Sequence, residues 1–265
     1  MTGADDSVLL RYQRQTAFRE LGCGGQRRLL ESGVLIVGMG GLGSWAAELL
    51  ARTGVGLLRV VDDGKVELTN IHRQSLYDEA DAAAGRQKVV VAAERLKKIN
   101  SAVVVEPVVA RLDADNVQTL ARGVHLILDG TDNFATRFLI NDYAVKARLP
   151  WVFAGVVRGE GQVMTIIPGR TACLRCIYDS PPPAELELRA GNAGVLPTAV
   201  AAIASIQAGE ALKILAGRSD AVSPHLLRLD LWYNRVQRID ASAAREDCPC
   251  CGKGCFEFLE PGRRS

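Results

Sequence analysis

Two pairs of cysteines in the second half of the chain have the spacing of metal ligands. Cys173 and Cys176 form the first pair, and the second lies in the run Cys-Pro-Cys-Cys-Gly that begins at Cys248. Four thiolates from two such pairs can bind a tetrahedral zinc ion in a closed, structural site. Cys250 leaves the register of the second pair open, although the Cys-Pro-x-Cys-Gly pattern favours Cys248 and Cys251. Unliganded reduced cysteines and a redox pair remain as alternatives.

A glycine-rich run near the start of the chain has the spacing of a phosphate-binding loop. It follows the apolar residues 34–37 and precedes a stretch rich in Ala and Leu. Glycines let the backbone turn tightly and let a phosphate approach, and the N–H groups of the following helix attract the phosphate. Asp62, which follows the next apolar run, stands where ribose hydroxyls are usually held. This spacing suits NAD, FAD and ATP equally, and the glycines concerned are Gly38, Gly40, Gly41 and Gly43.

Four polar side chains, Asn70, Arg73, Lys88 and Asp132, each stand in a loop or at a helix start that follows an expected strand. In an open α/β sheet these positions converge on the crevice at the carboxyl ends of the strands. Two cations, an amide and a carboxylate above a glycine loop suit a triphosphate with Mg²⁺ better than a dinucleotide. The cations would hold phosphate charge, and Asp132 would hold the metal. Taken singly, any one of them is better explained as a surface residue, so the prediction depends on the four together.

The elements that must position these residues follow a strict alternation in the first part of the chain. Five apolar strands joined by helices imply a parallel sheet with right-handed crossovers. A helical segment precedes them, reaching Leu30 with an interruption around residues 22–25. The expected strands are 34–37, 57–61, 103–108, 125–128 and 151–157, and the expected helices are 85–99, 113–121 and 133–147. In the first of these helices the apolar face is expected to carry Val89, Val90, Ala93 and Leu96.

The pattern changes after Trp151, where two strands flank the short sequence 158–161 and predict a hairpin. Two further strands are expected at 225–231 and 235–239. The long apolar helix expected at 195–215 has the length of a membrane span, but its Gln207, Glu210 and Lys213 argue for a buried core helix. The fold class is therefore α/β, a Rossmann-like doubly wound sheet with a parallel first half, a mixed second half and a zinc-tied C-terminal tail. We divide the chain into an N-terminal helical extension (1–33), an α/β domain with the zinc site (34–252) and a tail (253–265).

Composition excludes several classes of protein. The 265 residues carry 32 basic and 30 acidic side chains, so no charge excess suggests a nucleic acid or an anionic membrane as partner. Apolar residues make up 48% of the chain, as in ordinary globular proteins. The first seven residues are polar and do not resemble a signal peptide. We expect a cytoplasmic protein, in which seven cysteines favour metal or thiol chemistry over disulfides.

Taken together, the motifs resemble those of the ThiF/MoeB/HesA superfamily of adenylating enzymes, the relatives of ubiquitin-activating enzymes, and most closely its molybdopterin-synthase adenylyltransferase (MoeB-like) branch. The resemblance extends from Arg11 to Gly252. It rests on Arg-Tyr-x-Arg-Gln at 11–15, the glycine loop, Asp62, Asn-x-x-Arg-Gln at 70–74, Gly-x-x-Lys at 85–88, Thr-Asp-Asn at 131–133 and the cysteine pairs.

The resemblance implies an activity and a set of roles. The C-terminal glycine carboxylate of a ubiquitin-fold sulfur-carrier protein ending in Gly-Gly would attack ATP, giving an acyl-adenylate and pyrophosphate. Members are typically homodimers, in which Arg14 would reach the partner subunit's ATP. The implied ligands are ATP, Mg²⁺ and Zn²⁺. The implied catalytic residues are Arg14, Arg73, Lys88 and Asp132, and the implied nucleotide-binding residues add Asn70, Asp62, Asn133 and the four glycines.

One feature departs from the family pattern. Many relatives carry a cysteine for thioester or persulfide chemistry between the first zinc pair and the long helix, whereas no cysteine lies between Cys176 and Cys248 here. We therefore expect adenylation without a covalent enzyme–carrier intermediate. Two other functions stay open: an NAD-dependent oxidoreductase, supported by the glycine loop and Asp62, and the non-catalytic half of a heterodimeric activator. Neither the carrier nor the sulfur donor follows from the sequence.

Overall fold

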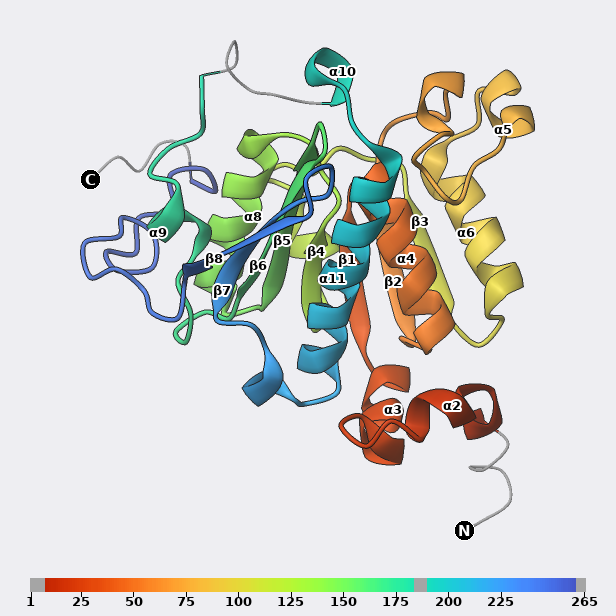
Figure 1. Cartoon of the computed structure of the whole chain (residues 1–265), viewed down its shortest axis with the longest axis horizontal. Helices are drawn as coiled ribbons and strands as arrows, with labels where there is room; N and C mark the ends of the chain where they lie inside the picture. Colours follow the sequence, from red (N-terminus) through yellow and green to blue (C-terminus); the bar gives the residue numbers. More distant parts are fainter. Residues whose placement is uncertain (1–7, 184–189, 261–265) are drawn as a thin grey trace.

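A single sheet with the strand order β3-β2-β1-β4-β5-β6-β7-β8 organises the computed structural model, which describes residues 8–183 and 190–260 (Figure 1). The strands β1 to β5 run parallel, and β6, β7 and β8 are each antiparallel to the neighbour before them. The predicted parallel first half and mixed second half are confirmed. The strands are β1 Gly33–Val37, β2 Leu57–Val61, β3 Val104–Val108, β4 Leu126–Asp129, β5 Trp151–Val157, β6 Glu160–Ile166, β7 His225–Asp230 and β8 Arg235–Asp240.

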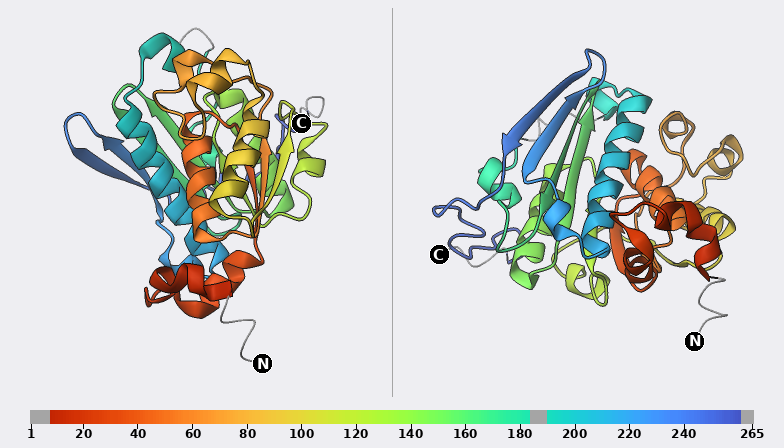
Figure 2. Two further views of the ribbon diagram at one scale, coloured as in Figure 1. Left: turned by 90° about the vertical axis from the view of Figure 1, so that its right-hand side faces the viewer. Right: turned by 60° about the horizontal axis from the view of Figure 1, so that its bottom comes forward.

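Helices cover both faces of this sheet (Figures 1 and 2). One face is packed by α4, α6 and α11, and the other by α7, α8 and the C-terminal tail, so each face has its own apolar core. The helices are α2 Gln13–Thr16, α3 Gly22–Leu30, α4 Gly41–Thr53, α5 Glu79–Ala83, α6 Lys88–Ile99, α7 Val117–Leu120, α8 Phe134–Ala147, α9 Leu174–Ile177, α10 Ala190–Ala193 and α11 Pro197–Leu215, with 3₁₀ turns η1 Leu10–Tyr12, η2 Leu68–Asn70 and η4 Ser219–Ala221.

The strand order places a switch point between β1 and β4. From β1 the chain crosses outward through α4 to β2, and from β4 it crosses through α8, on the opposite face, to β5. At such a point the loops after two adjacent strands turn away from each other and leave a crevice at the carboxyl ends of the strands. The glycine loop after β1 and the Thr-Asp-Asn loop after β4 face each other across this crevice.

Two helices differ from their predicted extents because local contacts compete with helical hydrogen bonds. The helix expected at 113–121 is limited to α7, since the Asp113 carboxylate accepts the backbone N–H groups of Asp115 and Asn116 and closes a turn. The helix expected from residue 85 starts at Lys88, because residues 86 and 87 pair with residues 65 and 66.

The buried face of α6 and the break in the N-terminal segment also differ from prediction. Val91 and Ala92 are buried in α6, whereas Val90 is 38% exposed, so the apolar face is rotated by about one residue from the one predicted. The N-terminal break falls between α2 and α3, and Gly22 to Gly25 belong to α3. Gly25 lets this helix pack closely against the end of α11, since a Cβ there would lie 3.3 Å from the Cβ of Ala216.

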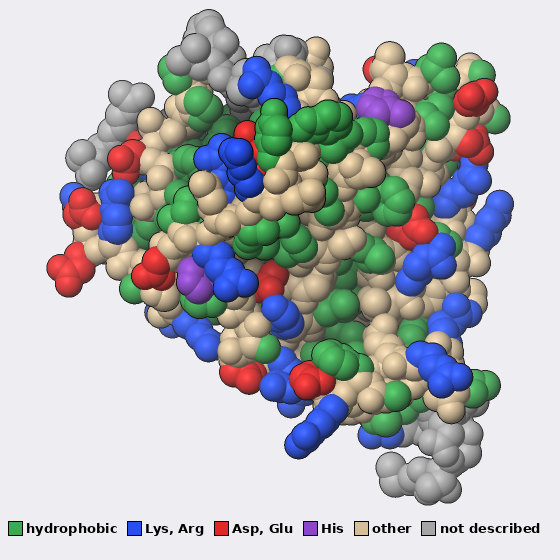
Figure 3. Space-filling view, viewed as in Figure 1, with side chains coloured by type: hydrophobic (Ala, Val, Ile, Leu, Met, Phe, Trp, Pro, Cys, Tyr) green, Lys and Arg blue, Asp and Glu red, His purple; other side chains and the backbone are tan. Residues whose placement is uncertain are grey.

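Among the described helices, α11 is long and apolar enough to cross a membrane, judged by length and composition alone. It packs along the sheet, and its buried Gln207 donates to the carbonyl oxygens of Asp129 (2.7 Å) and Val152 (3.0 Å). A core helix passes the same test of length and composition, and these contacts agree with the predicted buried role. In Figure 3 hydrophobic side chains occupy much of the middle of the face that carries α11 and α4, with charged side chains around the rim.

The C-terminal tail folds back against α8 and α9. The backbone N–H of Phe258 donates to the Asp142 carboxylate (3.0 Å), and the Phe258 ring lies 4.9 Å from that of Phe138. Arg175, in the turn of the first cysteine pair, forms an ion pair with Glu257 (2.7 Å). These contacts hold the residues that follow the second cysteine pair against the domain. The domain boundaries drawn from the sequence stay a prediction.

Candidate functional site

A cavity of about 490 Å³ opens at the carboxyl ends of the parallel strands, over the switch point. Its wall includes most of the residues that the sequence predicts for nucleotide binding, namely Gly38, Gly40, Gly41, Asp62, Asn70, Arg73, Lys88, Asp132 and Asn133. Two predicted site residues, Gly43 and Arg14, are not part of this wall.

The glycine loop has the shape that a phosphate requires. Gly38 has a φ of +88°, in the region that favours glycine, and a Cβ there would lie 2.7 Å from the Gly130 carbonyl oxygen. Helix α4 starts at Gly41 without a side-chain cap, so the N–H groups of its first turn are available to an anion. Gly43 lies behind the loop, where a Cβ would come within 1.9 Å of the Gly38 carbonyl oxygen. Its role is therefore close packing of α4 against the loop.

The Asp62 carboxylate is fixed before any ligand binds. One oxygen accepts the backbone N–H of Met39 in the glycine loop (2.6 Å), and the other accepts that of Gly64 (2.7 Å). These contacts orient the carboxylate just after the end of β2, where it forms part of the cavity wall. Such a carboxylate can accept hydrogen bonds from ribose hydroxyls.

The two predicted cations come from different elements. Arg73 donates to the Thr69 carbonyl oxygen and to the Asn70 side chain, both at 2.9 Å, so its guanidinium is held in the loop after η2. Burial lowers the pKa of Arg73, while the carboxylates of Asp132 and Glu67 act in the opposite direction. Lys88 opens α6, and its backbone N–H donates to the Gly64 carbonyl oxygen beside the Asp62 carboxylate (3.1 Å).

Asp132 and Asn133 divide two tasks at the start of α8. The Asn133 side chain caps the helix by accepting the N–H of Thr136 (2.9 Å). The exposed Asp132 carboxylate takes part in no hydrogen bond or ion pair with the residues that the structure describes. Oxygen ligands of this kind are what Mg²⁺ binds, together with the phosphates of a nucleotide. The chemistry of Asp132 therefore fits a magnesium ion.

The sequence reasoning missed Arg137, a buried cation in the second turn of α8 that also lines the cavity. Its Nε lies 2.9 Å from an oxygen of the fully buried Asp129, the last residue of β4. The available signal in the sequence was Arg137 itself, a charged residue followed directly by the apolar residues 138–140. The wall also includes Glu160, Gln162 and Arg228 from the second half of the sheet, whose strands carried no recognised motif.

Arg14 lies far from the cavity of its own chain. Its neighbours in the motif anchor the segment beneath α4: the Tyr12 hydroxyl accepts from Asn100 (2.8 Å), and Gln15 donates to Gln26 (2.6 Å) and to the Thr53 carbonyl oxygen (3.0 Å). This places α2 beyond the amino ends of the strands, whereas the cavity lies at their carboxyl ends (Figure 1). Arg14 itself is exposed and pairs with no described residue.

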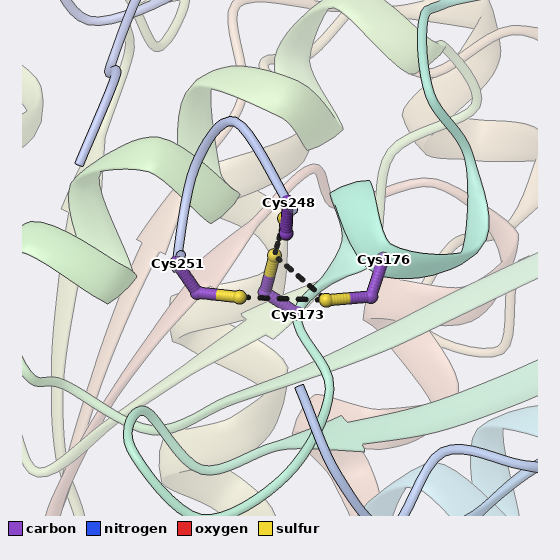
Figure 4. A group of neighbouring side chains, drawn as sticks. All are labelled: Cys173, Cys176, Cys248 and Cys251. Carbon is purple, nitrogen blue, oxygen red and sulfur yellow. Dashed lines mark hydrogen bonds between the residues drawn. The ribbon is translucent and has the colours of Figure 1, made fainter. Parts of the chain in front are cut away.

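The four predicted zinc ligands come together in one cluster (Figure 4). All four sulfur atoms lie within 4.8 Å of one another; the Sγ–Sγ distances are 3.6 Å for Cys173–Cys248, 3.9 Å for Cys173–Cys176 and 3.4 Å for Cys176–Cys251. A tetrahedron with Zn–S bonds of about 2.3 Å has edges of about 3.8 Å, so the spacing fits a zinc ion. Burial and the neighbouring Cys176 raise the pKa of the Cys251 thiol to about 12, and a bound cation would favour the thiolate instead.

Cys250 lies beside this cluster without belonging to it. It is fully buried, and its sulfur accepts a hydrogen bond from the Asn141 side chain (3.3 Å). The four-sulfur cluster contains Cys248 and Cys251, the second pair in the register that the sequence favours, and metal binding by these residues stays a prediction. None of the four clustered cysteines lines the cavity, so a metal held there would have a structural role.

Comparison with known proteins identifies the family. The family model described as ThiF family matches residues 12–250. The chain belongs to the ThiF family. This ThiF-family chain is 38% identical over 250 residues to the sulfur carrier protein ThiS adenylyltransferase of Bacillus subtilis (strain 168), covering 94% of this chain and 73% of the relative. It is 37% identical over 256 residues to the SAMP-activating enzyme E1 of Haloferax volcanii, covering 97% and 93%.

A longer relative and a solved structure extend the comparison. The chain is 41% identical over 245 residues to the adenylyltransferase and sulfurtransferase MOCS3 of Sus scrofa, and the match covers 92% of this chain but only 53% of that relative. The crystal structure of E. coli MccB with ATP superposes with a TM-score of 0.80 at 22% identity, covering 92% of this chain and 74% of MccB. This likeness shows a shared fold.

Proposed function

We propose that this ThiF-family protein is an ATP-dependent adenylyltransferase that activates the C-terminal glycine carboxylate of a small ubiquitin-fold sulfur-carrier protein. The observation that carries the proposal is the cavity itself, in which a glycine loop, two cations and a free carboxylate meet at the switch point. The relatives that match most of this chain are named as adenylating or carrier-activating enzymes.

Each side chain in the cavity has a task in holding ATP. The Gly41 N–H would bind a phosphate oxygen, and Asp62 would hold the ribose. Asn70, Arg73 and Lys88 would surround the triphosphate, where their charges offset its own. Asp132 would hold Mg²⁺, which when bound supplies further positive charge to the phosphates.

The reaction needs position and charge more than it needs a protein nucleophile. An oxygen of the carrier's carboxylate bonds to the α-phosphorus of ATP. The bond from that phosphorus to the oxygen bridging to the β-phosphate breaks, and its electron pair leaves with pyrophosphate. Because the carboxylate attacks as the anion, no proton has to be removed, and the cations of the cavity stabilise the developing charge.

The alternatives that the sequence left open explain less of the site. An NAD-dependent oxidoreductase uses the glycine loop and Asp62 but leaves the grouping of Arg73, Lys88 and Asp132 without a task. An inactive half of a heterodimer has no need for a complete set of nucleotide ligands, yet nine of the ten predicted nucleotide-binding residues line the cavity.

The decisive experiment measures ATP–pyrophosphate exchange with Mg²⁺ and a panel of sulfur-carrier proteins that end in Gly-Gly, of the thiamine and molybdopterin types. Exchange that depends on one carrier, and disappears when the last glycine of that carrier is deleted, is the expected result. It would also name the pathway, which we propose to be sulfur transfer in molybdopterin or thiamine synthesis. Tight NAD binding without exchange for any carrier would favour the oxidoreductase.

We further infer a homodimer in which Arg14 acts on the partner subunit's nucleotide. Arg14 is exposed, without a partner among the described residues, and lies at the opposite end of the sheet from its own cavity. The outward side of α11 is uncharged and small or apolar at Ala201, Ala202, Ser205 and Gly209, and a Cβ at Gly209 would meet nothing. A surface of this kind suits close packing against a second copy.

We also propose that the cysteine cluster holds zinc and that the protein is cytoplasmic. The zinc proposal is supported by the tetrahedral spacing of the sulfurs and by their separation from the cavity. The location is supported by the balanced charge and by the use of cysteines in a metal-type cluster rather than in disulfides.

A further inference from the structure

Arg137 is a cation that the nucleotide site does not use. It lines the cavity on the β5 side of the Thr-Asp-Asn loop, and its side chain is only 7% exposed. The guanidinium lies against two aromatic rings, with Cζ 5.3 Å from the centre of Phe134 and 5.2 Å from that of Phe153. Arginine side chains usually lie on the protein surface, so one that is buried this deeply at a cavity wall indicates a structural or functional task.

Three hydrogen bonds fix this guanidinium in place. Nε donates to Asp129 (2.9 Å), and Nη2 donates to the carbonyl oxygens of Thr131 (2.7 Å) and Ala154 (3.0 Å). Asp129 in turn accepts the backbone N–H and the hydroxyl of Thr131. Nη1 is different, because it donates to no atom of the described residues and is not among the buried unsatisfied atoms. Nη1 is therefore the nitrogen of Arg137 that has no partner among the described residues, and it remains available at the cavity.

Arg137 lies on the β5 side of the Thr-Asp-Asn loop, whereas Asp62 and Lys88 come from the β2 side of the sheet. Asp62 follows the last residue of β2 and Lys88 is the first residue of α6, whereas Arg137 borders Gly155 on β5. A Cβ at Gly155 would lie 3.4 Å from Nη2 and 3.6 Å from Nη1, so no side chain separates the guanidinium from this strand. From here the cavity wall continues over Gln162 and Arg228 on β6 and β7.

We propose that Nη1 of Arg137 receives the attacking carboxylate of the carrier and orients it toward the α-phosphate of ATP. This inference rests on the proposed function and assigns an acceptor-side residue within that same cavity. The incoming group would be a carboxylate at the end of an extended, glycine-ended chain lying over β5 and β6. Asp132, one residue after the Thr131 carbonyl that Arg137 holds, would then stand between the acceptor and the nucleotide.

The pairing with Asp129 suits this task. An unpaired arginine would bind a carboxylate strongly as a bidentate ion pair and reduce its nucleophilicity. Here the positive charge is already offset by a buried carboxylate, and Nε and Nη2 are engaged elsewhere, so only the two N–H groups of Nη1 remain to position the incoming oxygen. The other carboxylate oxygen stays free to bond to the α-phosphorus as pyrophosphate departs. Positioning of this kind lowers the barrier without tight ground-state binding.

The test uses the carrier that gives the strongest exchange and compares the wild-type enzyme with Arg137→Lys. A lysine retains the positive charge beside Asp129 but has one nitrogen where the guanidinium has three, so it cannot bind Asp129, the two carbonyl oxygens and the carrier together. We expect kcat/KM for the carrier to fall by about 10²-fold, as for a misplaced reactant. The Kd for the non-hydrolysable analogue AMPCPP should change less than about twofold. The exposed Arg122→Lys serves as the matched control and should change neither value.

A second measurement separates orientation of the carboxylate from damage to the fold. Carrier binding to the AMPCPP-loaded enzyme is compared for the natural carrier and for one whose C-terminal carboxylate is an amide. The wild-type enzyme should bind the amide more weakly, and Arg137→Lys should bind both equally. Gly155→Ala offers a variant without a lost hydrogen bond; its methyl group sits at contact distance from the guanidinium and should raise the carrier KM alone.

The outcomes are distinguishable. If the wild-type enzyme exchanges pyrophosphate but Arg137→Lys loses AMPCPP affinity and carrier affinity alike, Arg137 only supports the loop that carries Asp132, and the inference is wrong. If the wild-type enzyme and Arg137→Lys both bind the amidated carrier more weakly than the natural carrier, and by the same factor, the inference is also wrong, although the proposed function stands. Absence of exchange in the wild-type enzyme with every carrier would instead contradict the proposed function itself.

Discussion

The charged side chains of the cavity differ in what already binds them. Asp62 is held by two backbone N–H groups, Arg73 by a carbonyl oxygen and an amide, and Arg137 by Asp129 and two carbonyl oxygens. Asp132 alone among these four lacks a described protein partner. Groups held in this way need no reorganisation when a ligand arrives, whereas a free carboxylate can accept a metal ion.

Asp132→Asn should therefore abolish catalysis while leaving the fold intact. An amide in place of the carboxylate binds Mg²⁺ poorly, and the developing charge on the phosphates loses a cation. We expect carrier-dependent pyrophosphate exchange to fall by about 10²-fold or more. The matched control is Asp115→Asn, an exposed aspartate outside the cavity wall, which should leave the exchange rate unchanged. An Asp132→Asn enzyme that exchanges at the wild-type rate would remove Asp132 from the metal site.

At the level of elements, the cysteine cluster joins two segments that are distant in the chain. Cys173 and Cys176 flank the start of α9, and Cys248 and Cys251 stand in the turn after β8. The contacts of Phe258 and Glu257 then hold the following residues against α8 and α9. A metal at this junction would fix the tail to the sheet domain.

Cys251→Ser should lose the zinc and lower the melting temperature, because the metal contributes its binding free energy to the folded state. Elemental analysis of the wild-type protein should give about one zinc per chain. Cys250→Ser is the control in the same turn and should retain the metal, since Cys250 is not one of the four sulfurs that lie within 4.8 Å of one another. Retention of zinc by Cys251→Ser and its loss from Cys250→Ser would mean that the register is wrong.

Residues 178–193 link the first cysteine pair to α11, and in this crossover segment many relatives carry a cysteine for thioester or persulfide chemistry. Residues 184–189 of this segment lie outside the described residues, but the sequence places no cysteine between Cys176 and Cys248. Of the cysteines outside the cluster, Cys23 is exposed on α3, Cys250 is buried, and neither they nor Cys255 line the cavity. The acyl-adenylate should then be the last species that this enzyme forms.

Incubation of enzyme, ATP–Mg²⁺ and carrier should yield no thiol-sensitive adduct on a non-reducing gel or by intact mass. Thioester and persulfide formation require an accessible thiolate close to the adenylate, and no cysteine of the described chain is placed there. A relative with a cysteine in this segment serves as the positive control. An enzyme–carrier adduct that disappears on changing Cys23, Cys250 or Cys255 would add that residue to the catalytic set.

At the scale of the whole molecule, the two ends of the sheet have different tasks. The carboxyl ends of the strands carry the cavity, and the amino ends carry α2, α3 and the exposed Arg14. A residue at the amino end cannot reach the cavity of its own chain without rearrangement of the anchored Tyr12 and Gln15. Pairing of two chains would bring the Arg14 of one to the nucleotide of the other.

Arg14→Ala and Asp132→Ala chains should therefore complement each other. Each variant alone should be nearly inactive, and mixing with subunit exchange should restore activity from one intact site per heterodimer. Adding Gly209→Arg to both chains should block the recovery by placing a charge on the outward side of α11. Exchange proven by native mass spectrometry without any recovery would place Arg14 outside the active site.

Several features of the molecule are encoded locally and could be predicted from the sequence. Strand β5 covers Trp151–Val157 as expected, and α8, expected at 133–147, begins one residue later because Asn133 is its capping residue. Apolar periodicity and capping act over a few residues, so a short window contains the information. The spacing of the cysteine pairs is equally local, because each pair spans one turn.

Other features depend on contacts between distant residues, and only the tertiary structure decided them. Arg137 owes its position to Asp129 and to the Ala154 carbonyl on the neighbouring strand, and a single window of sequence contains neither that strand pairing nor its register. The rotation of α6 to bury Val91 instead of Val90 follows from the surface against which it packs. The sequence by itself determined the elements, the glycine loop, the ligand chemistry of each motif and the expected meeting of the motifs at the carboxyl ends of the strands. The order of the strands, which decides the motifs that face each other across the crevice and leaves Arg14 at the other end, depends on long-range packing.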